Sequence, residues 1–226
     1  MNAAHLYKRF GDKVVLEDVS LTVPDGAVVC LMAPSGRGKT TLLRMIAGLE
    51  TPDAGEILFD GKPVFSADLG LNLPPEKRNI GFVFQDFALW PHLTVFENVA
   101  FPLRARKDLS DLKSKVTDAL SLVGLADFAG RRVSELSGGQ QQRVGFARAI
   151  VSRPKIVLFD EPLSALDAQL RETMRGEIKR ITSALAMTSI FVTHDQEEAM
   201  SMSDRILVLN HGALEQAGAP IDIYTH

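Results

Sequence analysis

The stretch Ala33-Pro34-Ser35-Gly36-Arg37-Gly38-Lys39-Thr40 decides how this chain folds. A strand-like apolar run over residues 28–32 leads into it, and a run with helical spacing over residues 41–47 follows. The backbone N–H groups around its two glycines, together with the positive end of the helix dipole, form a concave anion site. The lysine would then reach the β- and γ-phosphates of a nucleotide, and the threonine hydroxyl would face Mg²⁺. The stretch therefore predicts a phosphate-binding loop between a strand and a helix.

The first position of this loop departs from the strict pattern, which has glycine where this chain has Ala33. If the position needs a positive φ, the Cβ of alanine costs on the order of 1 kcal/mol. The alternative interpretation is a tight strand-to-helix turn that carries an exposed lysine. The rest of the chain has to decide between a nucleotide site and such a turn.

Composition limits the classes of protein that fit. The chain has 226 residues, of which 46% are hydrophobic and 23% are charged, so it can bury a large core as one α/β domain with an inserted subdomain. The formal net charge of -3 gives no basic field, and we therefore expect no nucleic-acid partner. The single Cys30 lies in an apolar strand and cannot form an internal disulfide, which fits a reducing compartment.

The sequence contains no candidate membrane span, because no apolar run approaches the roughly 18 to 20 residues that a helix needs to cross a bilayer. The start of the chain, residues 1–5, lacks the charged and apolar regions of a secretory signal. We expect a cytoplasmic chain whose membrane role, if it has one, comes through a partner.

The first third of the chain alternates short apolar strands with turns. Residues 16–23 form one such strand, and the strand at 56–59 is followed by Asp60-Gly61, a hairpin turn. This pattern predicts an antiparallel β layer beside the nucleotide-binding layer. The helix after the loop is expected to stop near Gly48.

A mainly helical subdomain is predicted at about residues 88–152. Thr94 and Glu97 form a capping box that opens one helix, and Ser110 is expected to cap another that ends at Gly124. The aromatic and apolar residues near its start are expected to form its core, or else a surface that docks a partner. These residues are Phe87, Leu89, Trp90 and Phe96.

Polar residues follow three predicted strands, at the end where α/β sheets place ligand contacts. Gln85 follows the strand at 80–84, and it is either a metal or water ligand or the start of an ordinary loop. His194 follows the strand at 190–193 and is a candidate γ-phosphate contact, although a lone histidine is more often structural.

The third of these strands, residues 156–160, delivers two carboxylates, Asp160 and Glu161. Adjacent strand residues face opposite ways, which predicts separate tasks for them. Asp160 suits the shell of Mg²⁺, and Glu161 suits the water that attacks the γ-phosphate. Their alternative role, capping a helix, is less expected because Asp167 already stands before the next helix.

A second helix start, Ser137-Gly138-Gly139-Gln140, offers free N–H groups and therefore a second anion site. Its alternative interpretation is a simple capped helix start after a loop. The position of this stretch before the strand that carries the two carboxylates favours the anion site.

These motifs, in this order, resemble the ATP-binding cassette (ABC) ATPases over essentially the whole chain. The resemblance identifies residues 33–40 with the Walker A loop, Gln85 with the Q-loop, 136–140 with the signature motif, 156–160 with Walker B, Glu161 with the catalytic base, 164–167 with the D-loop and His194 with the switch histidine.

The resemblance implies the fold: a P-loop NTPase (RecA-like) core sheet with an antiparallel β subdomain and the inserted helical subdomain, within a single domain over 1–226. It implies ATP and Mg²⁺ as cofactors, with Glu161, His194 and Lys39 catalytic and Thr40, Gln85 and Asp160 on the metal. The implied nucleotide contacts are Phe10, Ala33, Pro34, Ser35, Gly36, Arg37, Gly38, Lys39, Thr40, Thr41, Gln85, Ser137, Gly138, Gly139, Gln140, Asp160 and Asp167.

Within the family, residues 87–95 and 193–199 look most like those of bacterial importer subunits. This implies ATP held between two cassettes packed head to tail, as a homodimer or with a similar subunit. It also implies integral membrane permease partners, an extracytoplasmic solute-binding protein, and a peripheral position at the cytoplasmic face of the inner membrane. The other readings are a cassette ATPase without a membrane partner and a regulatory module that binds nucleotide without hydrolysis.

Three features depart from the family pattern. Ala33 and Arg37 occupy loop positions where glycine and a smaller residue are usual, and Phe10 stands where a tyrosine or tryptophan usually stacks on adenine, with Tyr7 close by. Many importer ATPases of this kind also continue into a C-terminal regulatory β-barrel. The chain ends at His226 without one, so we expect a short member or a shortened chain.

Overall fold

A computed structural model describes residues 1–34 and 36–225, so the prediction for Ser35 lies outside the described residues. The chain divides into two compact units. The first contains Met1–Arg78 and the segment from Ala186 onward, and the second contains Asn79–Leu185.

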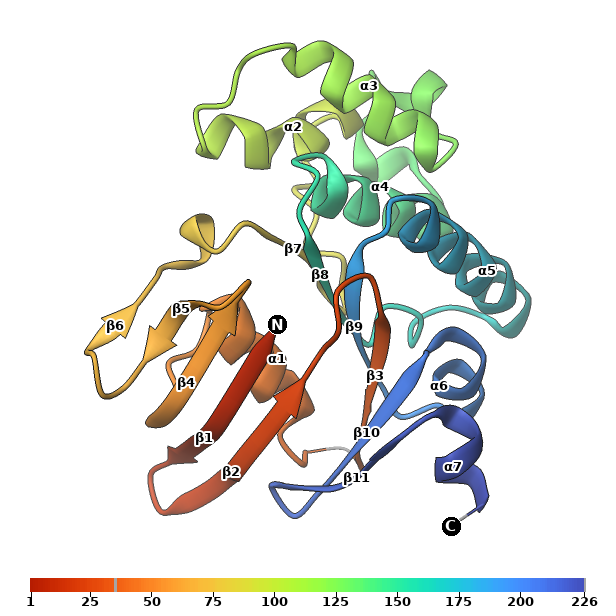
Figure 1. Ribbon diagram of the computed structural model, residues 1–226. Helices are drawn as coiled ribbons and strands as arrows, with labels where there is room; N and C mark the ends of the chain where they lie inside the picture. The colour runs from red at the N-terminus through yellow and green to blue at the C-terminus, as the bar shows by residue number, and fades with distance from the viewer. Residues whose placement is uncertain (35, 226) are drawn as a thin grey trace. The chain divides into compact units, whose positions relative to one another are not determined.

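The first unit contains an antiparallel sheet with the strand order β2-β1-β4-β5-β6 (Figure 1). The turn between β4 and β5 is formed by Asp60 and Gly61, which both have a positive φ, of 50° and 73°. Two such residues match the right-handed twist of a hairpin, and the predicted hairpin is confirmed. The strands are β1 (Asn2–Phe10), β2 (Lys13–Thr22), β4 (Ala54–Phe59), β5 (Lys62–Ser66) and β6 (Leu71–Asn72).

The second layer of this unit has the strand order β11-β10-β3-β9, in which β10, β3 and β9 are parallel and β11 pairs antiparallel with β10. Every residue of β9 is buried, as expected for a strand that is covered on both faces. Met32 pairs with Thr193, so β3 and β9 end at the same edge of the sheet. The elements are β3 (Val28–Met32), α1 (Lys39–Ala47), β9 (Thr188–Thr193), α6 (Gln196–Met202), β10 (Arg205–Asn210), β11 (Ala213–Gly218) and α7 (Pro220–Thr225).

The second unit combines two parallel strands with four α-helices and two short 3-10 helices, Ala126–Phe128 and Val133–Glu135. Its first helix begins as predicted, because the Thr94 side chain accepts a hydrogen bond from the Glu97 N–H at 3.2 Å and the Glu97 carboxylate accepts one from the Thr94 N–H at 2.8 Å. The elements are β7 (Ile80–Val83), α2 (Val95–Ala105), α3 (Leu112–Leu122), α4 (Gly138–Ile150), β8 (Ile156–Asp160) and α5 (Ala168–Ala184).

The expectation that Ser110 caps the second helix is wrong. The N-cap of α3 is Asp111, in a left-handed conformation with φ of 52°. Ser110 instead donates to Asp108 at 3.0 Å, and Lys115 donates to both oxygens of the same carboxylate at 2.8 Å. The hydrogen bonds from Lys115 and Ser110 lower the pKa of Asp108, and the Ser110 hydroxyl that was expected to cap the helix is engaged with this carboxylate.

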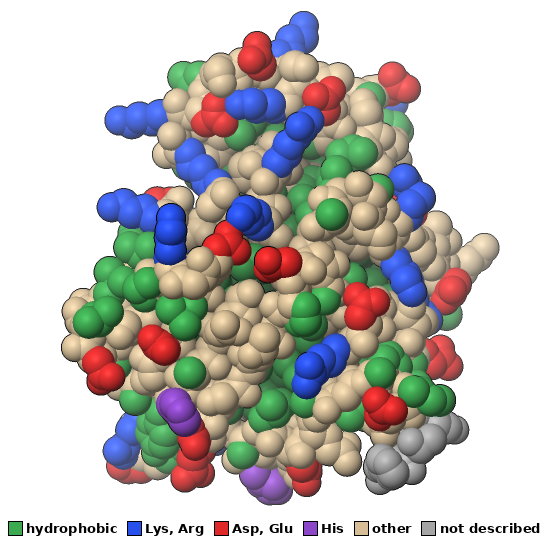
Figure 2. All heavy atoms as spheres, viewed as in Figure 1, with side chains coloured by type: hydrophobic (Ala, Val, Ile, Leu, Met, Phe, Trp, Pro, Cys, Tyr) green, Lys and Arg blue, Asp and Glu red, His purple; other side chains and the backbone are tan. Residues whose placement is uncertain are grey.

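One face of the molecule mixes both signs of charge (Figure 2). Blue and red side chains are interspersed over the face drawn in Figure 2, in keeping with a net charge of -3. Of the helices in the described part of the chain, none combines the length and the apolar character that a membrane crossing requires.

A buried arginine closes the C-terminal end of α1. Arg78 is 3% exposed, and it donates to the carbonyls of Met45 at 2.8 Å and Ile46 at 2.9 Å. The helix ends at Gly48 as predicted, with φ of 80°. A Cβ at Gly48 would lie 2.6 Å from Arg78 Nε, so glycine is needed both for the conformation and for the space. Burial lowers the pKa of Arg78 to about 10, which leaves it charged at neutral pH.

We expect Arg78→Ala to lower the free energy of unfolding by about 3 kcal/mol, because it strips the helix end of charged donors and leaves buried carbonyls unpaired. Arg44→Ala, on the exposed side of α1, is the control and should cost less than about 1 kcal/mol. Urea denaturation followed by circular dichroism measures both values. Equal losses in the two variants would show that Arg78 does not hold this helix.

Candidate functional site

The loop after β3 has the backbone of an anion site. Gly36 and Gly38 have φ of 74° and 94°, and α1 begins directly after Gly38 without a side-chain cap. A Cβ at Gly38 would lie 2.8 Å from Leu16 Cδ2 and 3.0 Å from the Val15 carbonyl oxygen, so only glycine fits there. In general, the first N–H groups of an α-helix are not used within the helix, so a helix start after such a loop can bind an anion.

Ala33 does not strain this loop. Over residues 1–34 and 36–225, Ala33 is not among the non-glycine residues with a positive φ, so its Cβ brings no left-handed cost. Its carbonyl accepts a hydrogen bond from Lys39 Nζ at 2.6 Å, and the Pro34 carbonyl lies 3.3 Å from the same nitrogen. The lysine is therefore folded over the loop, and alanine supplies the same backbone oxygen that glycine would.

Arg37 is exposed and makes a contact that no sequence pattern predicts. Its Nη1 donates to Nδ1 of His211 at 2.9 Å. His211 belongs to the turn between β10 and β11, which is fixed by a hydrogen bond of 2.8 Å from the Glu17 N–H to the Gly212 carbonyl. The two threonines that follow the lysine, Thr40 and Thr41, are partly buried in the first turn of α1.

The first unit brings His194 to the same edge as this loop. His194 follows β9 directly, and the strand pairing of Met32 with Thr193 starts both segments at one level. Ala33, Pro34 and His194 line one cavity of about 700 Å³. The residues on either side of the histidine are anchored, since Thr193 donates to Glu198 at 2.6 Å and Asp195 caps α6.

Phe10 presents an aromatic ring at the end of β1. The side chain is 48% exposed, and Lys8 Nζ lies 4.8 Å from the ring centroid. Lys8 is itself held by an ion pair of 2.8 Å with Glu50 and a hydrogen bond of 2.8 Å to the Thr51 carbonyl. A ring supported in this way is suited to stacking, although its contact with adenine stays a prediction.

The second unit gathers Gln85 and the two carboxylates at one sheet edge. Val83 of β7 pairs in parallel with Phe159 of β8, so Gln85 and Asp160 lie just past the same level. Asp160 is buried, whereas Glu161 is partly exposed and has φ of 44°. A non-glycine residue in that conformation costs about 1 to 2 kcal/mol and marks a constrained position.

Ser164 connects these groups. Its hydroxyl donates to the Glu161 carbonyl at 2.9 Å and accepts a long hydrogen bond of 3.4 Å from Gln85 Nε2. The amide of Ser164 also donates to the Glu161 carbonyl, at 3.3 Å. The left-handed turn after β8 is thereby closed on itself and joined to the segment after β7.

The second predicted anion site is a capped helix start. Gln140 N–H donates to the Ser137 hydroxyl at 3.4 Å, and the Ser137 N–H donates to the Gln140 side chain at 3.0 Å. A Cβ at Gly139 would lie 2.9 Å from Leu170, so this helix start packs tightly on the start of α5, whereas a Cβ at Gly138 would meet nothing within 4 Å. Both interpretations of the stretch therefore stay open, because a capped start also presents N–H groups.

Asp167 has the capping role that the sequence predicted. Its carboxylate accepts a hydrogen bond from the Leu170 N–H at 2.9 Å at the start of α5. Each unit thus assembles part of the predicted set. The first brings together the loop and His194, and the second brings together Gln85, Ser164 and the two carboxylates.

Comparisons with known proteins identify the family to which this chain is similar. The model of the family described as ABC transporter matches residues 16–164. The spermidine/putrescine import ATP-binding protein PotA of Legionella pneumophila (strain Lens) is 54% identical over 220 residues, which are 97% of this chain and 59% of that protein. The trehalose/maltose import ATP-binding protein MalK of Thermococcus litoralis is 49% identical over 220 residues, again 97% of this chain and 59% of that protein. The chain spans about three fifths of the length of these curated relatives.

Among solved structures, a dimeric bacterial ABC transporter cassette matches with a TM-score of 0.81 at 33% identity, covering 97% of this chain and 98% of that one. The same cassette in a post-hydrolysis state bound to ADP and Pi matches equally, with a TM-score of 0.81. The predicted P-loop NTPase fold class is confirmed.

Gly38→Ala should lower the free energy of unfolding by more than about 2 kcal/mol, because the new Cβ meets a backbone oxygen and φ is left-handed. Gly138→Ala is the matched control in a helix start with open space, and it should be neutral or slightly stabilising. Chemical denaturation of both variants beside the parent measures the difference. A Gly38→Ala chain as stable as the parent would contradict the geometry described for the loop.

Proposed function

Because this chain belongs to the ABC transporter family, we propose that it binds and hydrolyses ATP and thereby powers the movement of a solute through a membrane permease. One observation carries the proposal: the glycine loop and His194 in one unit, and Gln85 with the two carboxylates in the other, follow the carboxyl ends of paired parallel strands, where α/β proteins bind ligands. Import is the direction that the names of the two relatives give for those proteins.

We assign the phosphates of ATP to the loop and the start of α1. The N–H groups around Gly36 and Gly38 bind the phosphate oxygens, and Lys39 moves from the loop carbonyls to the β- and γ-phosphates. His194 contacts the γ-phosphate, and Phe10 stacks on the adenine. The buried, paired position of Lys39 supports this role, since a lysine already held over the loop reorders little on binding.

Mg²⁺ fits the chemistry of Thr40, Gln85 and Asp160, which offer a hydroxyl, an amide oxygen and a carboxylate, the hard oxygen ligands that this ion prefers. When bound, the ion would neutralise charge on the phosphates. Glu161 polarises the attacking water and takes its proton, a task that suits a carboxylate on a constrained turn beside the metal ligand.

A second copy of the chain completes the site in this proposal. The helix start at 137–140 would contact the nucleotide held by a partner cassette through its N–H groups and the Ser137 hydroxyl. The pairing of two cassettes is a property of the dimeric relative in the solved structures, and we propose it here for this chain. ATP binding then shifts the equilibrium toward the closed pair and hydrolysis releases it.

Two other functions are less well supported. A cassette ATPase without a membrane partner is less well supported because the relatives at 54% and 49% identity carry the names of import ATP-binding proteins. A regulatory module that binds nucleotide without hydrolysis would not need Asp160, Glu161 and His194 together.

Glu161→Gln tests the proposed hydrolysis. We expect ATP turnover to fall by at least about 100-fold, because the amide cannot take a proton from water. The variant should still bind ATP and accumulate as a dimer, since the phosphate-binding residues are untouched. Glu172→Gln, the same change on an exposed part of α5, should keep the parental rate. Steady-state phosphate release and size-exclusion chromatography with ATP measure both, and parental turnover in Glu161→Gln would reject this base.

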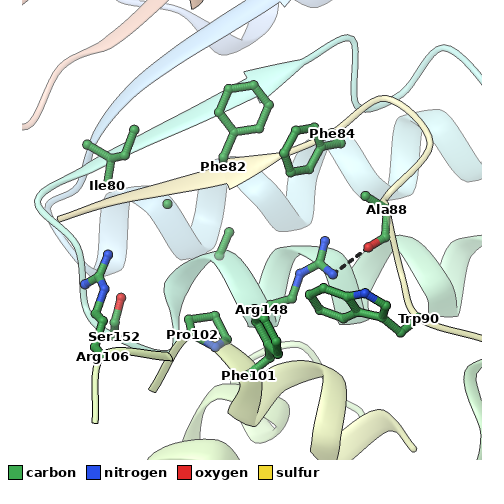
Figure 3. Close-up of a pocket in the computed structure, with 12 residues that line it drawn as sticks. Ile80, Phe82, Phe84, Ala88, Trp90, Phe101, Pro102, Arg106, Arg148 and Ser152 are labelled. Carbon is green, nitrogen blue, oxygen red and sulfur yellow. Dashed lines mark hydrogen bonds between the residues drawn. The ribbon is translucent and has the colours of Figure 1, made fainter. Parts of the chain in front are cut away.

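A groove beside the Gln85 segment is the proposed contact for the permease. It has a volume of about 430 Å³ and is lined largely by aromatic and apolar side chains of β7, α2 and the segment between them (Figure 3). Phe101 is 44% exposed there, and its ring centroid lies 4.3 Å from that of Trp90. Of the residues expected to form the helical core, Phe87 is buried, while Leu89, Trp90 and Phe96 are partly exposed. Phe87 therefore belongs to the core, and the docking surface stays a proposal for the partly exposed members.

Phe101→Asp should lower the fraction of the chain that sediments with membranes of its own cells by at least about tenfold, because a carboxylate in an aromatic anchor site repels an apolar partner segment. Leu69→Asp is the control, at a side chain that is 72% exposed in the other unit. Quantitative blotting of the pellets measures binding. Equal sedimentation of the two variants would move the permease contact elsewhere.

The proposed location follows from this partner, as a peripheral subunit at the cytoplasmic face of the inner membrane that works with a solute-binding protein outside. The solute is not assigned. The two relatives carry the names of polyamine and sugar importers at 54% and 49% identity, and the ATPase subunit need not touch the solute.

A further inference from the structure

An arginine is buried in the floor of the groove. Arg148 belongs to α4, on the face that also carries Val144 and Ala147, and it is 7% exposed. Figure 3 shows its guanidinium between the end of β7 and the indole of Trp90, with a hydrogen bond to Ala88. A charge in such a place is costly unless it is fully engaged.

The guanidinium is engaged by the backbone of one turn. Nη1 donates to the Ala88 carbonyl at 2.7 Å, and Nη2 donates to the Phe87 carbonyl at 2.6 Å. The Trp90 ring centroid lies 5.0 Å from the guanidinium carbon, in cation–π range. Burial lowers the pKa of Arg148 to about 10, with Asp86 opposing that shift, so the side chain stays charged at neutral pH.

This turn has an unfavourable backbone. Phe87 and Ala88 have φ of 59° and 43°, so two consecutive residues are left-handed and neither is a glycine. Each costs about 1 to 2 kcal/mol without compensation. Because both carbonyls face the same side, a forked donor with two parallel N–H groups satisfies them together. The turn also packs on α4, since a Cβ at Gly145 would lie 3.4 Å from Phe87 Cβ.

The turn lies between two functional segments. Gln85 precedes it by two residues and contacts Ser164, which bonds to the carbonyl of Glu161. Trp90 follows it by two residues and forms one wall of the groove. A shift of the turn would therefore displace the Gln85 amide and the indole together.

We propose that Arg148 is a positioning residue: its guanidinium holds the Phe87–Ala88 turn in the left-handed conformation, and through that turn it fixes both Gln85 and the Trp90 wall of the groove. The part that concerns Gln85 rests on the proposed ATP hydrolysis. The part that concerns the turn and Trp90 does not.

Tryptophan fluorescence tests the turn directly, because Trp90 is the only tryptophan in the chain. Arg148→Met keeps an apolar stem and removes the fork, and Arg148→Lys keeps the charge but offers a compact donor in place of the fork. In both variants we expect a red-shifted emission and an acrylamide quenching constant raised about twofold, as the wall of the groove loosens. Arg131→Gln is the matched control, since that guanidinium also rests on an aromatic ring, 4.7 Å from the Phe128 centroid, at an exposed position.

Ala88→Gly in the Arg148→Met background separates positioning from mere packing. Glycine adopts a positive φ without strain, so it should return the emission and the quenching at least halfway to the parental values. A loss that comes only from packing in the core would not be relieved by removing a methyl group from the turn. Parental fluorescence in folded Arg148→Met and Arg148→Lys, or no recovery with Ala88→Gly, would overturn the proposal.

A double-mutant cycle tests the link to Gln85. Arg148→Lys should lower kcat about tenfold with KM for ATP changed less than about threefold, and Gln85→Ala should lower kcat at least as much. If the arginine acts through Gln85, the double variant loses no more than Gln85→Ala alone. Fully multiplicative losses would overturn this link. A parent chain without any ATPase activity would instead reject the proposed function, and the fluorescence result would still decide the role of Arg148 at the turn.

Discussion

Parallel strand pairing is the constraint on which the functional residues of this chain depend. In the first unit, the register of β3 with β9 starts the phosphate-binding loop and the segment of His194 from one level. In the second, the register of β7 with β8 does the same for Gln85 and for Asp160. A shift of one residue in either pair would turn the strand faces over, so buried strands fix this register strongly. The positions of the groups proposed for catalysis are thus a consequence of packing in the core.

The chain turns sharply after three of these strands, and it stabilises each sharp turn differently. After β3, glycines adopt positive φ without cost, and close contact at Gly38 leaves no room for any other residue. After β8, Glu161 adopts a left-handed conformation with a side chain, and Ser164 closes the turn on its carbonyl. After β7, two left-handed residues in succession are held by a guanidinium. Strain without glycine therefore occurs next to the residues proposed for chemistry, where backbone strain commonly accompanies function.

The sequence was sufficient wherever the signal is local. Sequence analysis predicted four features that each depend on residues within a few positions of one another: the glycine loop, the hairpin at Asp60-Gly61, the Thr94 capping box and the helix end at Gly48.

The prediction that Ser110 caps a helix was wrong because its hydroxyl donates to the Asp108 carboxylate, which Lys115 also holds. Residue spacing alone does not show which of two nearby partners a hydroxyl chooses. Whether Ala33 strains the loop depends on its φ, which the residue type alone does not determine. Contacts between distant segments were out of reach: Arg37 with His211, and Arg148 with a turn some 60 residues away. For the contact of Arg148, the one sign in the sequence is a charged residue on the apolar face of a predicted helix.

The choice of arginine at position 148 itself points to specificity more than to stability. Transferring a guanidinium into an apolar groove costs several kcal/mol, and a well-packed apolar residue of similar volume is often as stable or more so. An apolar residue, however, cannot satisfy two carbonyls that face the same way, and the backbone would relax to a right-handed turn in which they point elsewhere. Relaxation would spare the strain at Phe87 and Ala88 but would release the segments on both sides. On the proposal made for Arg148, the guanidinium favours the left-handed turn, and this is the conformation in which Gln85 contacts Ser164 and Trp90 packs against Phe101.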